Sequence, residues 1–229
     1  MLGVRPGETV CDLMCDGGTL GVALGGAVGA RGNVVLVDKD PALLRRAEAG
    51  VAATGCAVSS KLATDGASPL LDASYDRIAS LCTLGFWGGD PLLHVAREAM
   101  RSNGCAAVLT WGTDAPLHEA ALAHALHDVL GMTSPFLTRC LARPDPRQAE
   151  GWEPVSVHDV VRFDGIATYW AALVTERSVA IELANQPDDA VEALRAACQR
   201  ALAPCTAADG TMRIPVHATV YCAVTERRV

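Results

Sequence analysis

The stretch Val10-Cys11-Asp12-Leu13-Met14-Cys15-Asp16-Gly17-Gly18-Thr19-Leu20-Gly21 lies near the start of the sequence and indicates the fold. An apolar run ends in an acid, and a short glycine turn leads into a segment that can form a helix. A second apolar run, from Asn33 to Val37, is followed directly by Asp38. A strand, a glycine turn, a helix and a second strand that ends in an acid begin a doubly wound nucleotide-binding sheet. We therefore expect an α/β fold with a ligand held at the ends of these strands.

The positions of the glycines distinguish between two kinds of ligand. In the dinucleotide fingerprint G-x-G-x-x-G, Asp16 would replace the first glycine, and its carboxylate would repel a pyrophosphate. The stretch fits better as an acid on the first strand, Asp12, followed by a short glycine turn. In this form it resembles the first motif, D-x-G-x-G-x-G, of the class I S-adenosylmethionine (SAM)-dependent methyltransferases. Asp12 and Gly18 match the ends of that motif, whereas Met14 and Asp16 stand where two glycines are expected.

The resemblance implies a fold, a cofactor and a set of binding residues. The fold would be a doubly wound, Rossmann-like methyltransferase sheet, mostly parallel with an antiparallel last strand, and the cofactor would be SAM. Asp38 would bind the ribose, Lys39 would flank the adenine, and residues 16–18 would lie against the methionyl end. Asp65 would hold the adenine, although an aspartate that only makes a turn explains this position equally well. The implied cofactor-binding residues are Asp12, Asp16, Gly17, Gly18, Asp38, Lys39, Asp65, Gly66 and Cys82.

A second match to the family lies at the expected fourth strand. The segment from Asp72 to Ile78, Asp-Ala-Ser-Tyr-Asp-Arg-Ile, resembles the D-x-S-F-D-x-I stretch through which the family enters that strand. Cys82 would follow the strand at the ligand crevice, because open α/β sheets bind ligands at the carboxyl ends of their strands. Trp87 in the next loop fits a residue that stacks on a substrate as well as one that packs on a helix.

The rest of the sequence predicts alternating helices and strands. The expected helices span residues 19–30, 41–53, 90–101, 116–130, 167–183 and 188–202, and the later strands span residues 56–60, 75–81, 105–110, 152–163 and 213–224. Thr19 is expected to cap the first helix, and Asp40 with Pro41 to start the second. Asn103 and Gly104 are expected to break the third helix. Without repeats or a low-complexity linker, residues 1–229 are expected to form a single methyltransferase-like domain.

Composition excludes several classes of protein. Half of the 229 residues are hydrophobic and 20% are charged, which is typical of a globular protein. The net charge of −7 argues against nucleic acid or an anionic membrane as the main partner. With no signal peptide and no apolar run long enough to span a bilayer, we expect a cytoplasmic protein. The nine cysteines are scattered without a CxxC pair and are expected to be buried apolar residues rather than redox groups.

The histidines of the expected helix 116–130 are the remaining chemical candidates. His124 and His127 share one helical face, and we favour solvent-exposed histidines over a metal site because no further ligands are apparent. No metal is therefore expected. His118 lies close to the end of the fifth strand and is a weak candidate for a general base.

Two hypotheses about function follow. The first is a SAM-dependent methyltransferase that acts on a small-molecule metabolite, because the Asn-Pro-Pro-Tyr motif of many nucleic-acid methyltransferases is absent after the fourth strand. A SAM-dependent reaction other than methylation stays open. The second is a non-catalytic subunit with the methyltransferase fold, which stabilises or completes a catalytic partner and has lost SAM. Three features favour the second hypothesis: Met14, Asp16 and the start of the sequence almost directly at the first strand. The last of these is also the reason to expect association, into homo-oligomers or with a partner methyltransferase.

Overall fold

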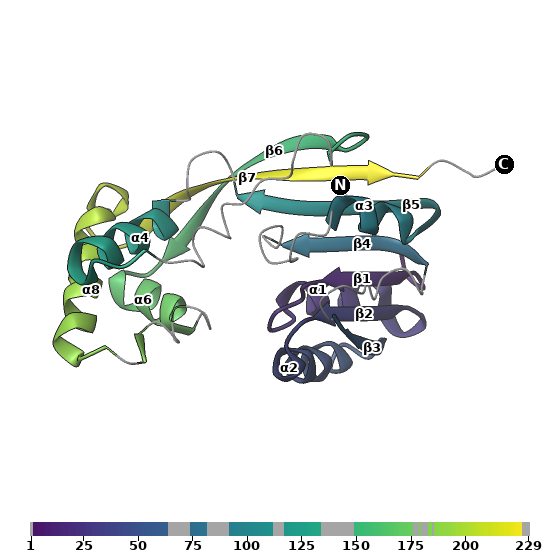
Figure 1. The fold of residues 1–229 in the computed structure, drawn as a ribbon, viewed down its shortest axis with the longest axis horizontal. Coiled ribbons are helices and arrows are strands. Elements are labelled where there is room, and N and C mark those ends of the chain that lie inside the picture. The colour runs from purple at the N-terminus through teal and green to yellow at the C-terminus, as the bar shows by residue number, and fades with distance from the viewer. Residues whose placement is uncertain are drawn as a thin grey trace. The chain divides into compact units, whose positions relative to one another are not determined.

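A computed structural model describes residues 2–63, 74–81, 92–111, 117–133, 149–175, 179, 183–184 and 186–225 (Figure 1). Its elements are β1 (Thr9–Leu13), α1 (Thr19–Val28), η1 (Gly29–Arg31), β2 (Asn33–Asp38), α2 (Pro41–Ala52), β3 (Ala57–Leu62), β4 (Tyr75–Leu81), α3 (Leu92–Glu98), β5 (Met100–Trp111), α4 (Leu117–Leu130), β6 (Glu153–Phe163), α6 (Ile166–Thr175), α8 (Asp188–Ala201), η3 (Ala203–Cys205) and β7 (Met212–Val224). In this part of the chain, no helix is long and apolar enough to cross a membrane.

The strands form one seven-stranded sheet in the order β3-β2-β1-β4-β5-β7-β6. The strands from β3 to β5 pair in parallel, and Figure 1 shows β7 running in the opposite direction to β5. The expected mostly parallel sheet with an antiparallel last strand is therefore confirmed. The chain moves outward from β1 to β2 and β3, and then returns to β4 on the other side of β1. This reversal makes the carboxyl ends of β1 and β4 the switch point at which open α/β sheets bind ligands.

The central strands are buried on both faces. On β2, Val34 and Leu36 belong to one buried cluster, together with residues of α1 and α2. Val35 and Val37 belong to a second cluster, which includes Leu93 of α3. Because successive side chains of a strand point to opposite faces, these helices lie on opposite sides of the sheet. The continuous apolar run that predicted this strand therefore reflects burial on both faces.

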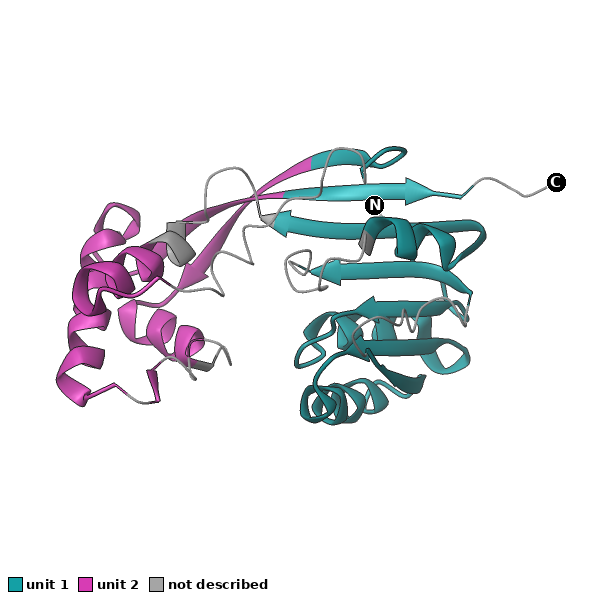
Figure 2. Ribbon diagram, viewed as in Figure 1, with its two compact units in different colours: residues 1–110, 142–155, 219–229 teal, residues 111–141, 156–218 magenta. Residues whose placement is uncertain are grey.

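The chain divides into two compact units (Figure 2). Unit 1 comprises residues 1–110, 142–155 and 219–229, and unit 2 comprises residues 111–141 and 156–218. Unit 2 has a hydrophobic core of its own, to which α4, α6, α8 and β7 contribute Leu122, Tyr169, Leu194 and Ile214. The single domain expected over residues 1–229 stays a prediction.

Most expected elements are present with boundaries that differ by a few residues, and β4 has the expected bounds. Two expectations are wrong. The cap of α1 is Gly18 rather than Thr19, because Gly18 adopts a left-handed φ of 85° and no side chain caps the helix. The other error concerns the start of β5. The described part of the helix expected over residues 167–183 is α6, and its expected continuation lies mostly outside the described residues.

β5 begins at Met100, five residues before the expected position, and Asn103 and Gly104 lie inside it. Asn103 has a φ of 64°, and the pairing with β4 shifts between Tyr75–Met100 and Arg77–Cys105. Asn103 and Gly104, which were expected to break a helix, therefore mark an irregularity in the pairing of β5 with β4. Extra residues in one strand can form a bulge without ending the pairing of the two strands.

The cap of α2 makes a measurable contribution to stability. The Asp40 carboxylate accepts hydrogen bonds from the backbone N–H groups of Ala42 (2.7 Å) and Leu43 (3.4 Å), and Pro41 occupies the first turn. Asp40→Ala should lower the free energy of unfolding by about 1 kcal/mol in urea denaturation, because two N–H groups lose their acceptor. Asp40→Asn retains a capping oxygen and should lose much less. Equal stability of the alanine variant and the wild type would refute this role.

Candidate functional site

The turn after β1 has an uncommon backbone conformation. Met14, Asp16 and Gly18 have φ values of 57°, 48° and 85°. These are the three positions at which the D-x-G-x-G-x-G motif carries glycine. The turn thus adopts a conformation that favours glycine, although two of the three residues have side chains. A left-handed backbone at each of these two residues costs on the order of 1–2 kcal/mol of conformational energy. Surrounding contacts must stabilise this strained turn.

Hydrogen bonds to the end of β2 hold the turn in place. Asp38 at the end of β2 is 5% exposed, and its Oδ2 accepts a hydrogen bond from the Asp16 N–H at 3.0 Å. Its Oδ1 accepts another from the Asp40 N–H at 2.9 Å. The Cys15 N–H donates to the Val37 carbonyl at 3.0 Å. Asp38 therefore joins the turn after β1 to the turn after β2, a role beyond the ribose contact implied by the resemblance.

Two glycines allow α1 to pack closely against its neighbours. A Cβ atom on Gly18 would lie 2.7 Å from the Cα and Cβ atoms of Ala47 in α2. A Cβ atom on Gly21 would lie 2.9 Å from Leu36 Cδ2 and 3.1 Å from Asp12 Oδ2. The contact at Gly18 is too short for van der Waals packing and involves the α2 backbone, so a larger residue there would displace the start of α1. A larger residue at Gly21 would instead require the side chains of Leu36 and Asp12 to shift.

Asp12 on β1 is a buried carboxyl group with an unpaired oxygen. The residue is 1% exposed, and its Oδ2 has no hydrogen-bond partner among the described residues. Burial raises the pKa of Asp12 from 3.8 to about 7. The negative charges of Asp38 and Asp16 add to this rise, whereas a hydrogen bond from the Gly21 N–H to the carboxylate opposes it. An unpaired buried oxygen is costly, and a ligand group or a water molecule at the turn would satisfy it.

The end of β4 is tied to the end of β1. The hydroxyl of Ser80 is buried and donates a hydrogen bond to the Leu13 carbonyl at 2.9 Å. Sequence reasoning missed this residue, although a serine in an apolar strand at the expected crevice was an available signal. The bond holds together the two strand ends that flank the switch point.

The structure brings together six of the nine implied cofactor residues at the ends of β1 and β2. Asp16 is exposed and Lys39 is half-buried. Asp12 lies on β1, Asp38 ends β2, and Gly17 and Gly18 lie in the turn after β1. The predicted positions of Asp65, Gly66, Cys82 and Trp87 lie outside the described residues. His118 belongs to α4, but its side chain is also outside the described part, so its proposed role as a base stays a prediction.

The cysteines beside the turn are not reactive groups. Cys11 and Cys15 are buried and free. Burial raises the pKa of both thiols, and the neighbouring charge of Asp12 raises it further, so neither is a thiolate near neutral pH. The described residues also contain no group of three or more His, Cys, Asp or Glu side chains that could hold a metal ion.

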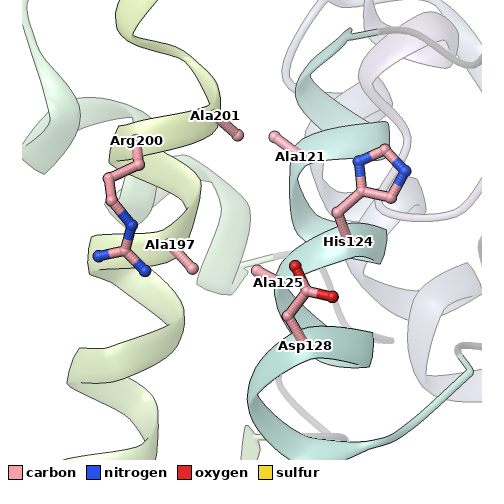
Figure 3. Close-up of a pocket in the computed structure, with 7 residues that line it drawn as sticks. All are labelled: Ala121, His124, Ala125, Asp128, Ala197, Arg200 and Ala201. Carbon is pink, nitrogen blue, oxygen red and sulfur yellow. The ribbon is translucent and has the colours of Figure 1, made fainter.

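A groove in unit 2 lies between α4 and α8 and has a volume of about 380 Å³ (Figure 3). It is lined by Ala121, His124, Ala125, Asp128, Ala197, Arg200 and Ala201. Figure 3 shows the alanines of the two helices pointing toward one another, so their small side chains allow the helices to approach closely. His124 and His127 are exposed, as the sequence predicted. We interpret the groove as a feature of helix packing, because it contains no implied cofactor residue.

Solved structures resemble the whole chain, although no protein-family model and no curated protein match the sequence. The YcgJ protein from Bacillus subtilis aligns over 99% of this chain and 95% of its own, with a TM-score of 0.59 and 11% identity. A SAM-dependent methyltransferase from Thiobacillus denitrificans in complex with S-adenosyl-L-homocysteine aligns over 99% and 88%, with a TM-score of 0.52 and 16% identity. Precorrin-6y C5,15-methyltransferase from Geobacter metallireducens aligns over 96% and 82%, with a TM-score of 0.50 and 10% identity. The chain therefore has the class I SAM-dependent methyltransferase fold.

Proposed function

We propose that this chain, which has the methyltransferase fold, is a SAM-dependent methyltransferase that acts on a small-molecule metabolite. The observation that supports this proposal most strongly is the turn after β1, which takes a glycine-type backbone at Met14, Asp16 and Gly18 and is anchored to Asp38. A strained turn needs a reason to persist, and close approach of the backbone to a ligand is a common one. The same turn lies at the strand ends where this class of sheet binds ligands.

The residues at the turn fit SAM in four respects. The unpaired Oδ2 of Asp12 offers a buried acceptor, and Gly18 and Gly21 keep the start of α1 close to the strand ends. Asp38 would contact the ribose, because each carboxylate oxygen that accepts one backbone N–H has a second lone pair. Lys39 follows directly and would flank the adenine. The residues present therefore fit the cofactor, although Met14 and Asp16 carry side chains where the motif has glycine.

When bound, SAM would supply a methyl group that its sulfonium has already activated. The chain itself would have to orient the acceptor and exclude water, so no fixed catalytic motif is required. A small molecule is the favoured acceptor, because the net charge of −7 disfavours nucleic acid.

A second candidate function is a non-catalytic subunit that supports a partner methyltransferase. Two observations favour it: Asp16 places a carboxylate where the motif has glycine, and both oxygens of Asp38 already accept backbone hydrogen bonds. On this view, Asp38 would be a structural residue of the turn, and the site would bind SAM only in the presence of a partner, or not at all.

Calorimetric titration of SAM into the purified chain separates the two candidates. We expect the wild type to bind SAM, and Asp38→Ala to bind it at least about tenfold more weakly, because a ribose contact and an anchor of the turn are lost together. Asp128→Asn removes an exposed charge of α4 and is the matched control, with unchanged affinity. Circular dichroism and thermal unfolding establish that each variant is folded. A folded wild type that does not bind SAM would contradict the enzyme hypothesis for the isolated chain and favour the subunit.

A further inference from the structure

Two histidine side chains meet on neighbouring strands of unit 2. His158 lies on β6 and His217 on β7, and these two strands are adjacent in the sheet. The centroids of the two imidazole rings are 4.5 Å apart, and the ring planes meet at 75°. Both residues are exposed, so the pair is accessible to a ligand from solvent and neither ring is fixed by packing in a core.

The ring nitrogens of imidazole are ligands for borderline divalent metal ions. Zn²⁺, Cu²⁺ and Ni²⁺ bind imidazole, whereas Mg²⁺ and Ca²⁺ prefer oxygen ligands. When the protein holds a second imidazole beside the first, binding of the ion to the second ring becomes intramolecular. The pair therefore binds at least about tenfold more tightly than one ring alone, provided that a nitrogen of each ring reaches the same ion.

The separation of the two rings meets this condition. Zn–N bonds are about 2.0–2.1 Å long, which places an ion about 3.2 Å from the centroid of each ring that binds it. In a tetrahedral arrangement, the two centroids would be about 5 Å apart. The observed separation is 4.5 Å. The rings meet edge to face, so one of them has to turn about its side-chain bonds, and its exposure leaves it free to do so.

The pair supplies two of the four ligands of a tetrahedral ion. Among the residues that the structure describes, no third His, Cys, Asp or Glu side chain joins the two histidines. Asp159 follows His158 directly, but successive side chains of a strand point to opposite faces, and its Oδ1 accepts a hydrogen bond from the Val160 N–H at 2.7 Å. Water would therefore fill the other two positions, and the site would hold its ion less tightly than a closed site with four protein ligands.

We propose that His158 and His217 form a surface site for a borderline divalent metal ion of the zinc and copper class. The bound ion links β6, the last strand of the sheet, to its neighbour β7. Because it binds the folded ribbon, it also stabilises the fold by mass action. The site is independent of the proposed methyltransferase function, because neither histidine belongs to the turn after β1.

The test is calorimetric titration of Zn²⁺ into the untagged wild type, His158→Gln, His217→Gln and the control His94→Gln. His94 is an exposed histidine of α3 that lies 3.2 Å from Glu98, so its removal eliminates a competing histidine–carboxylate pair. We expect a Zn²⁺ site whose affinity falls at least about tenfold in both His158→Gln and His217→Gln and stays unchanged in the control. Mg²⁺ should not bind there. Circular dichroism establishes that each variant is folded.

Nuclear magnetic resonance identifies the ligands directly. Zn²⁺ should shift the ring C–H signals of His158 and His217 together, at the same ratio of metal to protein. If only one ring shifts, or only one of the two variants loses affinity, a single imidazole binds the ion and the paired site is overturned. Unchanged affinity in both variants, or no Zn²⁺ binding by the folded wild type, also overturns it, and the two rings then make only an aromatic contact.

Discussion

Gly18→Ala is expected to lower the free energy of unfolding by about 2–5 kcal/mol, the sum of a left-handed backbone and an overpacked contact. Gly18 has a φ of 85°, which alanine adopts only with strain. The new Cβ would also lie 2.7 Å from the Cα and Cβ atoms of Ala47. Because one of these atoms belongs to the α2 backbone, a rotamer change cannot relieve the clash. Urea denaturation at constant pH measures the loss.

Two further glycines separate the contributions of strain and clash. Gly7 has a φ of 87°, and a Cβ atom added to it would have nothing within 4 Å, so Gly7→Ala should cost only the strain of about 1–2 kcal/mol. Gly26 lies inside α1 with open space around it, and Gly26→Ala should stabilise the chain by up to about 1 kcal/mol. If Gly18→Ala costs no more than Gly7→Ala, the contact between the turn and α2 is not important for stability.

Asp12→Asn is expected to remove a large pH-dependent component of stability. The pKa of Asp12 is about 7 in the folded chain and 3.8 in an unperturbed carboxyl group. Between these values, the folded chain holds a proton that the unfolded chain has released, so this group stabilises the fold most below pH 3.8 and loses that contribution as the pH rises through 7. The difference in pKa corresponds to about 4 kcal/mol.

The measurement is urea denaturation of the wild type and Asp12→Asn from about pH 4.5 to about pH 8, a range that brackets the loss of the proton. Other carboxyl groups impose their own pH dependence, but they are shared by both proteins and cancel in the difference. Relative to the variant, the wild type should lose stability by several kcal/mol as the pH rises across this range. Asparagine can still accept the hydrogen bond from the Gly21 N–H, so the comparison isolates the charge. A difference that does not change with pH would show that Asp12 is already ionised in the folded chain at low pH.

The sequence by itself determined the class of fold and the location of the candidate site. The run of buried residues on β2, the acids at the ends of β1 and β2 and the glycines between them are local features, and local sequence encodes them directly. The start of α2 was predictable for the same reason, since Asp40 and Pro41 act on N–H groups only two or three residues away. The bounds of β4 were predicted from the resemblance of the segment from Asp72 to Ile78 to the family's D-x-S-F-D-x-I stretch.

Only the tertiary structure decided how Met14, Asp16 and Asp38 work together. The sequence showed two residues in glycine positions, but not that the turn keeps its left-handed backbone around them. That conformation depends on the Asp38 carboxylate, which is 22 residues from Asp16 in sequence and reaches it through strand pairing. The early start of β5 has a similar origin, because pairing of Met100 with Tyr75 overrides the local helix pattern. Contacts between distant segments are not visible in any single stretch of sequence, and this is why the strained turn and the unpaired oxygen of Asp12 emerged only from the fold.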